Sequence, residues 1–371
     1  MKIIRLICRI ITGSVFVFSG AVKAIDPLGS AYKFHDYFQA FNLDFLQPLC
    51  LPLAIILFTA EFIVGFSVLT GIRQKEGIFG MFILIIFFTP LTFILALANP
   101  VSDCGCFGDA IHLTNWETFE KNIVLFLMVL ILFTGRKKSS ATFRPVTEWI
   151  LTISVIILCA GFAIYNLIFL PVIDFLPYNT GTHIRDKMII PDDAPINQYE
   201  TTFIYEKGGE QKEFTLENYP ADDTAWKFIE QKSVLKKKGY EPKIHDFAIT
   251  NINNYDITDS ILNNPGYTLL MIVRKLELAN PAKLGKGFKA GKKCLSEGID
   301  FYILTASGIG EIKKEENGLP ICQVDETTLK TMIRSNPGYI VLKNGTIIEK
   351  WSWANFPDDV LQVIKNDRNQ N

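Results

Sequence analysis

Two long runs without any charged side chain constrain this chain more than any other feature. The first run covers residues 77–102, which are 26 residues without Asp, Glu, Lys or Arg, and the second covers the 25 residues 149–173. About 20 apolar residues in a helix cross the hydrocarbon core of a bilayer. Three further apolar stretches, 3–22, 49–72 and 116–135, have the length of a span. The sequence therefore predicts five membrane helices, with the lipid bilayer as a partner.

The first stretch is the weakest of the five, because only 13 residues separate Arg9 from Lys23. Cations at the ends of a span can extend to the membrane interface, so this spacing still permits a span. A basic start and a possible cleavage site at residues 21–24 leave a cleavable signal peptide open. We expect a retained helix, because the next segments continue the same pattern.

Positive charge is distributed unevenly between the connecting segments. The opposite segments, 26–48 and 100–115, carry Lys33 as their only cation. Lysine and arginine favour the cytoplasmic side, so we expect the N-terminus inside, and residues 100–115 and everything after residue 173 outside. In a bacterial cytoplasmic membrane that side is the periplasm or the exterior, where disulfides persist. Nine cations lie on the expected inner segments: Lys2, Arg5, Arg9, Arg73, Lys75, Arg136, Lys137, Lys138 and Arg144.

The chain becomes polar after the fifth span. We expect a stalk over residues 174–198, a β-hairpin around Gly208-Gly209, and a helix over 223–239 that ends in three lysines. Strands and helices then alternate to the end of the chain. The strands are expected at 267–273, 301–305, 319–323, 339–343 and 346–351, and the helices at 281–297, 326–335 and 357–365.

This order, a β-α-β unit followed by a helix, a β-hairpin and a last helix, is typical of thioredoxin-like domains. Residues 243–247 and 336–345 resemble that superfamily in detail, and by the resemblance Pro337 takes the place of the cis proline beside its active site. Redox-active members carry Cys-x-x-Cys after the first core strand, where residues 274–280 hold no cysteine. Ordinary thioredoxin activity is therefore not expected.

Two cysteines remain in the C-terminal domain, Cys294 and Cys322. They fit a pair of buried thiols or a structural disulfide, and a relocated redox pair stays open.

The most reactive feature of the chain is Cys104-Gly105-Cys106, in a short polar gap between two apolar runs. A disulfide between residues two apart closes a strained ring, and strain makes such a bond more oxidising. Gly105 lacks a Cβ and relieves part of that strain. Cys50, on the same expected side, is a candidate resolving partner. Cys8 and Cys159 are expected to be packing thiols.

Four motifs in the first half of the chain, at residues 9–13, 19–23, 61–65 and 104–109, resemble the DoxX/MauE group of membrane proteins over about residues 3–135. The cysteine motif resembles the MauE branch most closely. MauE proteins are associated with maturation of methylamine dehydrogenase, which requires disulfides, and DoxX proteins with quinone-linked oxidation. A quinone is thus implied by the resemblance alone. Related four-helix redox proteins use Cys-x-x-Cys, so the one-residue spacing departs from them.

Other polar residues allow more than one interpretation. Glu61 lies near the middle of its span, where a carboxylate serves a proton path, pairs with a buried cation or has a structural role. Lys23 and Asp26 are placed for a structural ion pair at the membrane interface. A metal site is an alternative for the cysteine segment, with these four ligands: Cys104, Cys106, Asp109 and His112.

The expected architecture is a membrane α-helical bundle at 1–145, a fifth transmembrane helix at 146–173, residues 174–239, and an α/β thioredoxin-like domain at 240–371. The leading hypothesis is a thiol–disulfide oxidoreductase that acts on extracytoplasmic protein thiols and passes electrons to a quinone. A non-enzymatic membrane-anchored scaffold that binds a partner is the alternative. A net charge of −1 gives no reason to expect nucleic acid. The site residues carried forward are Cys104, Cys106, Cys50 and Glu61.

Overall fold

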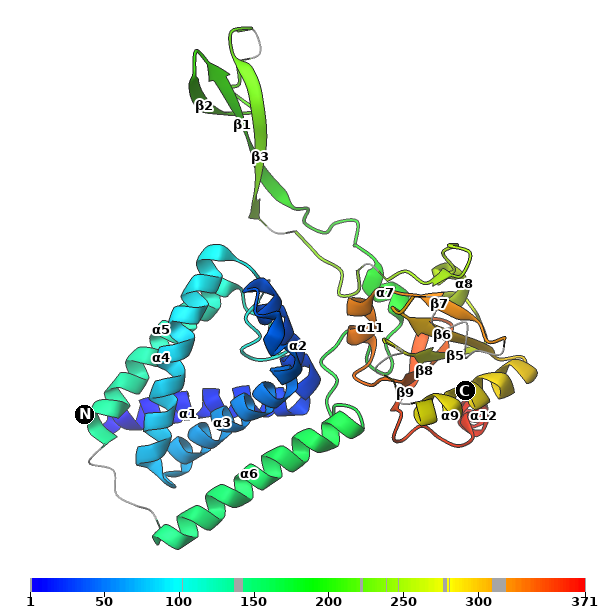
Figure 1. Cartoon of the computed structure of the whole chain (residues 1–371), viewed down its shortest axis with the longest axis horizontal. Coiled ribbons are helices and arrows are strands. Elements are labelled where there is room, and N and C mark those ends of the chain that lie inside the picture. The colour runs from blue at the N-terminus through cyan, green and yellow to red at the C-terminus, as the bar shows by residue number, and fades with distance from the viewer. Residues whose placement is uncertain are drawn as a thin grey trace. The chain divides into compact units, whose positions relative to one another are not determined.

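The computed structural model describes residues 2–101, 103–136, 143–220, 223–237, 239–245, 247–275, 279, 281–308 and 318–370. Five of the described helices are long and apolar enough to cross a membrane, and each falls on an expected span. They are α1 (Lys2–Ile25), α3 (Cys50–Thr70), α4 (Gln74–Ala98), α5 (Asn115–Gly135) and α6 (Pro145–Ile168) (Figure 1). The chain is therefore a multi-pass membrane protein.

Small residues allow α1 and α3 to pack closely along their length. A Cβ on Gly20 would lie 2.7 Å from the backbone oxygen of Phe58, and one on Gly65 would lie 2.7 Å from the backbone nitrogen of Val17. Small residues have this role at many helix interfaces in membranes. Whether α1 is retained in the mature protein stays a prediction.

Cys8 and Cys159 are both buried in apolar clusters of the bundle. Cys159 lies on α6 and packs with residues of α1 and α3, so it contributes to the contact of the fifth helix with the bundle. The structure thus agrees with the prediction that these two cysteines are packing thiols.

The basic segments meet at one end of the bundle. Arg9 donates from Nε to the oxygen of Val68 at 2.6 Å, near the end of α3. The Arg73 guanidinium lies 3.8 Å from the ring centroid of Trp149, near the start of α6. The start of α1, the turn after α3 and the start of α6 therefore share one end, as five antiparallel spans require. Which side of the membrane this end faces stays a prediction, and Lys137 and Lys138 lie outside the described residues.

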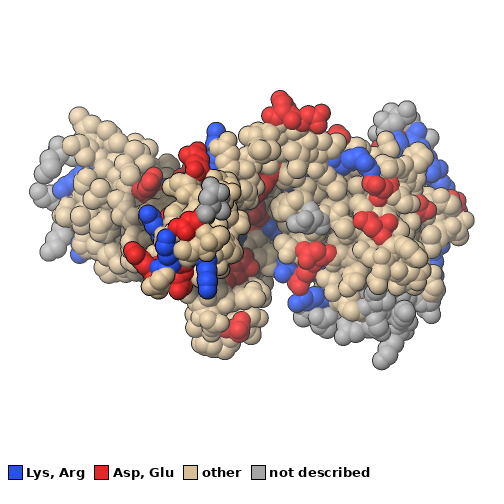
Figure 2. Space-filling view, turned by 90° about the horizontal axis from the view of Figure 1, so that it is seen from above, with Lys and Arg blue, Asp and Glu red and all other residues tan. Residues whose placement is uncertain are grey.

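Large apolar side chains cover the outer faces of the membrane helices. Ile83, Phe87, Ile157 and Leu158 are each more than half exposed. Figure 2 shows Lys and Arg interspersed with Asp and Glu, between wide areas that carry no charge. Exposed apolar side chains at this density need lipid around them.

The connecting segment over residues 26–48 is largely helical. This segment forms helix α2 (Pro27–Ala40) and the short 3-10 helix η1 (Asp44–Leu49). The Asp26 carboxylate accepts a hydrogen bond from the Gly29 amide at 2.9 Å and so caps α2, with Pro27 at its first position. Asp at the cap and Pro next to it are favoured at helix starts.

The C-terminal part has a thioredoxin-like fold. Its six-stranded sheet has the order β4-β7-β6-β5-β8-β9, with β5, β6 and β7 parallel and β8 and β9 antiparallel. The peptide bond before Pro337 is cis, at the position that the resemblance assigned. The elements are β4 (Thr250–Asn251), α8 (Thr258–Leu262), β5 (Tyr267–Ile272), α9 (Pro281–Ser296), β6 (Asp300–Thr305), β7 (Ile321–Gln323), α11 (Glu326–Met332), β8 (Gly338–Lys343), β9 (Thr346–Ser352) and α12 (Val360–Gln370).

Cys294 on α9 and Cys322 on β7 are both buried and free. Burial raises the pKa of the Cys294 thiol to about 11 and that of Cys322 to about 12. Both are therefore thiols at neutral pH and poor nucleophiles.

Residues 183–247 form a separate compact unit. It contains α7 (Ile184–Met188) and a sheet of three antiparallel strands, β1 (Gln198–Lys207), β2 (Glu210–Thr215) and β3 (Lys227–Lys237). The hairpin around Gly208-Gly209 is confirmed.

The expected helix over 223–239 is wrong, because β3 occupies most of that segment. β3 pairs with β1 from Gln198 to Glu206. Pairing with a distant strand supplies the backbone partners that a helix would have supplied locally. Lys236 makes an ion pair with Glu200 at 2.6 Å, instead of ending a helix. Lys238, the last residue of that lysine run, lies outside the described residues.

Candidate active site

The Cys104–Cys106 segment forms a compact loop between α4 and α5. Gly105 has a φ of +61°, which favours glycine. The Gly108 amide donates to the oxygen of Gly105 at 3.1 Å, and Phe107 pairs with Ile111 in an isolated antiparallel bridge. These contacts hold both cysteines on one tight turn, here named the cysteine loop (residues 103–111).

The two thiols are in direct contact. Their Sγ atoms lie 2.6 Å apart, with Cys104 as the donor. This hydrogen bond lowers the pKa of Cys106 to about 6, with help from the positive charges of Lys121 and Lys23 and against burial and Glu61. The bond to Cys106 and burial raise the pKa of Cys104. The reduced pair therefore holds one proton on Cys104 and a negative charge on Cys106 at neutral pH.

A buried polar network connects the cysteine loop to the membrane helices. Lys23 Nζ lies 2.8 Å from each carboxylate oxygen of Glu61, and both side chains are less than 10% exposed. The Ser19 hydroxyl lies 2.9 Å from Glu61 Oε2 and 2.7 Å from the carbonyl oxygen of Cys106, and donates its one proton to either. Glu61 thus pairs with a buried cation, as one of its interpretations required.

The expected ion pair between Lys23 and Asp26 is wrong. Lys23 binds Glu61, and Asp26 binds Arg334 of the thioredoxin-like domain. The two residues lie at the end of one helix and the start of the next, so spacing alone did not determine their partners.

Helix α2 holds the other side of the cysteine loop. Tyr37 donates its hydroxyl to the carbonyl oxygen of Cys104 at 2.6 Å, and burial raises its pKa. Lys33 pairs with Asp103 at 2.9 Å, and Asp103 accepts from the Gly105 amide at 2.8 Å. Sequence reasoning missed Tyr37 and the role of Lys33, although Asp26-Pro27 is a start signal for the helix that carries them.

A cavity of about 430 Å³ lies inside the bundle, beside the two thiols. Its walls come from α1 to α5 and the cysteine loop and are mostly apolar, with Phe16, Phe38 and Phe88 among them. Polar groups gather at the end where the thiols lie. Its volume is in the range of sites for small organic molecules. The polar lining includes Cys104, Cys106, Glu61, Lys23, Lys121 and Asn122.

Cys50 lies apart from this arrangement. It is buried at the start of α3 with Ala31 and Ala54, and it is not among the residues that line the cavity. Its role as a resolving partner stays a prediction.

Metal-ligating side chains do not converge on the cysteine loop. Within the described part of the chain, no three His, Cys, Asp or Glu side chains are placed to hold a metal ion.

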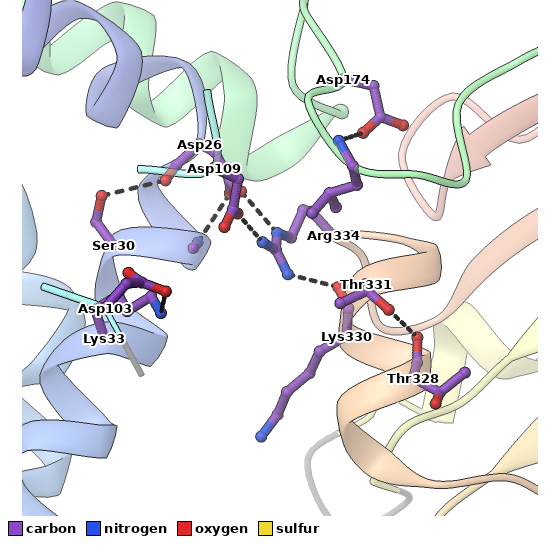
Figure 3. Close-up of polar contacts among 12 residues, drawn as sticks. Asp26, Ser30, Lys33, Asp103, Asp109, Asp174, Thr328, Lys330, Thr331 and Arg334 are labelled. Carbon is purple, nitrogen blue, oxygen red and sulfur yellow. Dashed lines mark hydrogen bonds and ion pairs between the residues drawn. The ribbon is translucent and has the colours of Figure 1, made fainter. Parts of the chain in front are cut away.

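The thioredoxin-like domain contacts the cysteine loop through Arg334, close to the cis peptide bond. Its Nε lies 2.8 Å from Asp26, and its Nη2 lies 2.7 Å from Asp109 of the cysteine loop (Figure 3). Of the residues at the usual Cys-x-x-Cys position, Arg274, Lys275 and Ala279 are described. The remaining residues of that segment, Leu276, Glu277, Leu278 and Asn280, lie outside the described residues.

Comparison with known proteins found two family models and a solved structure similar to parts of the chain. Residues 1–135 match the family model for methylamine utilisation protein MauE, and residues 199–238 match a domain of unknown function, DUF8463. A solution structure from Bacteroides thetaiotaomicron, described as a protein disulfide isomerase, is similar at 12% identity. The matched region covers 34% of the present chain and 85% of the Bacteroides protein, with a TM-score of 0.27. None of the curated proteins matches the chain.

The MauE match covers helices α1 to α5 and the cysteine loop, which together build the site. The predicted resemblance to MauE is therefore confirmed, and that to DoxX stays a prediction. A MauE-like membrane bundle with two thiols in contact supports a role in membrane thiol redox chemistry.

Proposed function

We propose that this protein is a thiol–disulfide oxidoreductase of the bacterial cytoplasmic membrane. Its Cys104–Cys106 pair would act on protein thiols at the outer face. The observation that carries the proposal is the contact between the two thiols, in which the hydrogen bond from Cys104 lowers the pKa of Cys106. Thiol exchange depends on the thiolate that a lowered pKa favours, whereas a structural disulfide does not.

The charge difference assigns separate roles to the two sulfurs. In the oxidised pair, a client thiolate attacks Cys104, and Cys106 leaves because the thiolate with the lower pKa is the better leaving group. A second client thiolate then attacks the client sulfur of the mixed disulfide and releases Cys104. The client gains one disulfide and loses two electrons and two protons, and the pair becomes the reduced dithiol.

The cavity provides a fitting place for the electron acceptor, which we take to be a quinone. Aromatic walls suit its ring, and Lys121 and Asn122 can donate hydrogen bonds to its oxygens. A quinone bound there would accept two electrons and two protons, which restores the disulfide. Ser19 connects Glu61 to the Cys106 backbone, so the buried polar network reaches the site of this reaction.

A scaffold role remains the second candidate, because one observation favours it. The cysteines of the described thioredoxin-like domain are Cys294 and Cys322, and both are buried. In that role the domain binds a partner, and the Cys104–Cys106 pair only stabilises the loop.

The thiol state of the pair in intact cells separates the two candidates. Rapid alkylation with a mass tag should find Cys104–Cys106 mainly oxidised in air and more reduced when quinone is depleted. In Cys106→Ser, the Cys104 thiolate can attack the disulfide of an oxidised client, which forms a mixed disulfide and releases one client thiolate. No second cysteine of the pair can then displace the client, so acid quenching and alkylation should capture the mixed disulfide. Cys50→Ser keeps the pair and should not accumulate it. A thiol state that never changes, together with no trapped client, would favour the scaffold.

A further inference from the structure

Arg334 connects the thioredoxin-like domain with two parts of the membrane domain at once. Its side chain is 5% exposed and donates to Asp26, which caps α2, and to Asp109 in the cysteine loop. Figure 3 shows the guanidinium facing both carboxylates. Gly29 leaves room for it, since a Cβ there would lie 3.1 Å from Arg334 Nη2.

Asp109 lies only three residues after Cys106, in the turn closed by the Phe107–Ile111 bridge. A carboxylate held by a buried guanidinium has little freedom to move. The turn that sets the separation of the two sulfurs is therefore anchored from outside the membrane bundle.

Helix α2 provides a second connection through the same surface. Lys330, Arg334 and Arg274 lie 5.1, 5.2 and 5.6 Å from the ring centroid of Tyr32. The next residue, Lys33, makes an ion pair with Asp103, the first residue of the cysteine loop. The thioredoxin-like domain thus contacts the helix that also positions the start of the cysteine loop.

Burial of Arg334 makes its two ion pairs costly to break. The buried guanidinium of Arg334 is compensated by the buried Asp26 and the partly buried Asp109, and removal of Arg334 leaves both carboxylates without their cation. Arginine presents its N–H groups in a rigid planar fork, which fits two carboxylates at fixed positions better than the single flexible ammonium of a lysine.

We propose that Arg334 is a positioning residue through which the docked thioredoxin-like domain sets the geometry of the Cys104–Cys106 pair. The domain would contribute to thiol chemistry without a dithiol of its own, through the face beside its cis proline. An effect of Arg334 on the rate of client oxidation rests on the proposed function. Its effect on the disulfide–dithiol equilibrium of the Cys104–Cys106 pair does not.

The test measures the disulfide–dithiol equilibrium of the pair in the purified full-length chain, in detergent and in glutathione buffers of known ratio, without quinone or client. We expect Arg334→Gln to change the equilibrium constant by about fivefold or more. Lys350→Gln is the matched control, because Lys350 makes a similarly buried ion pair with Asp174 at 2.6 Å that does not include the cysteine loop. The control should stay within about twofold of the unmodified chain.

Charge reversal provides a second measurement. Arg334→Asp combined with Asp109→Arg should restore the equilibrium constant to within about twofold of the original, while Arg334→Asp alone should not. If Arg334→Gln does not fold, Arg334→Lys and Asp109→Asn are measured in its place. The proposal is overturned if these variants leave the constant unchanged, or if Lys350→Gln changes it equally. This measurement does not depend on turnover. The proposal for Arg334 can therefore hold or fail separately from the proposed oxidoreductase function.

Discussion

At the residue scale, the site depends on the unequal environments of two neighbouring thiols. Cys104 is the donor and Cys106 the acceptor of one hydrogen bond, and the lysines of α1 and α5 favour charge on Cys106. The sequence motif does not indicate which of the two cysteines has the lower pKa. The asymmetry is a property of the surrounding helices.

The first prediction concerns the pH dependence of Cys106. Because its pKa is lowered from 9.0 to about 6, the thiolate is present above pH 6 and is lost below it. Alkylation of Cys106 should rise through about pH 6 and then level off, as followed by mass spectrometry of the modified peptide. Lys121→Ala should move this profile to higher pH, while Lys75→Ala, at the opposite end of α4 from the loop, should not. A profile centred near pH 9 would contradict the assignment.

The second prediction concerns the buried pair of Lys23 and Glu61. Glu61→Gln leaves the Lys23 charge without compensation, which should lower the free energy of unfolding by about 3–5 kcal/mol. The double variant Lys23→Met, Glu61→Leu should recover most of this loss, because it removes both charges. Thermal unfolding in detergent would measure both. Equal stability of the single variant and the unmodified chain would show that the pair is not buried as described.

At the element scale, the cysteine loop depends on its turn and on α2 beside it. Gly105 needs a positive φ, and a Cβ on it would lie 2.8 Å from Lys33 Cγ. Gly108 also has a positive φ of +53°, but a Cβ there would meet nothing within 4 Å. Alanine at Gly108 would therefore cause backbone strain alone, whereas alanine at Gly105 would also clash with Lys33.

The third prediction follows from this difference. Gly108→Ala should lower the free energy of unfolding by about 1–2 kcal/mol, the cost of a left-handed residue. Gly105→Ala should cost more, because Lys33 must also move and its ion pair with Asp103 weakens. The thermal stability of the two variants and the rate of disulfide formation in Cys104–Cys106 would test this. An equal effect of both substitutions would speak against close packing of α2 on the loop.

At the scale of the whole molecule, the basic segments lie at one end of the bundle and the cysteine loop at the other. Arg9 and Arg73 mark the first end, and the contact of Arg334 with Asp109 marks the second. The positive-inside rule assigns the basic end to the cytoplasm. The thiols and the thioredoxin-like domain would then share the oxidising side.

The fourth prediction is the topology itself. A reporter that is active only in the cytoplasm should be active when it is fused after residue 140, and inactive when it is fused after residue 200. A reporter that needs an oxidising compartment should give the opposite pattern. The reverse outcome for both reporters would place the cysteine loop in the cytoplasm and remove the basis for stable disulfides.

Sequence alone determined the parts of this protein that depend on local composition. Uncharged runs located the spans, because a bilayer requires about 20 apolar residues in a helix. The strand and helix order identified the thioredoxin-like fold, and Cys104 and Cys106 were recognised from their spacing. Each span, strand, helix or cysteine pair is signalled by a short stretch of chain, and the fold follows from their order.

Only the tertiary structure decided which distant residues meet. The partner of Lys23 is Glu61 rather than Asp26, and Arg334 reaches Asp109 across 225 residues of chain. The same reason explains why β3 is a strand, since its backbone partners lie on β1. Buried charges and unpaired backbone groups select partners by proximity in the fold, and sequence spacing does not contain that information.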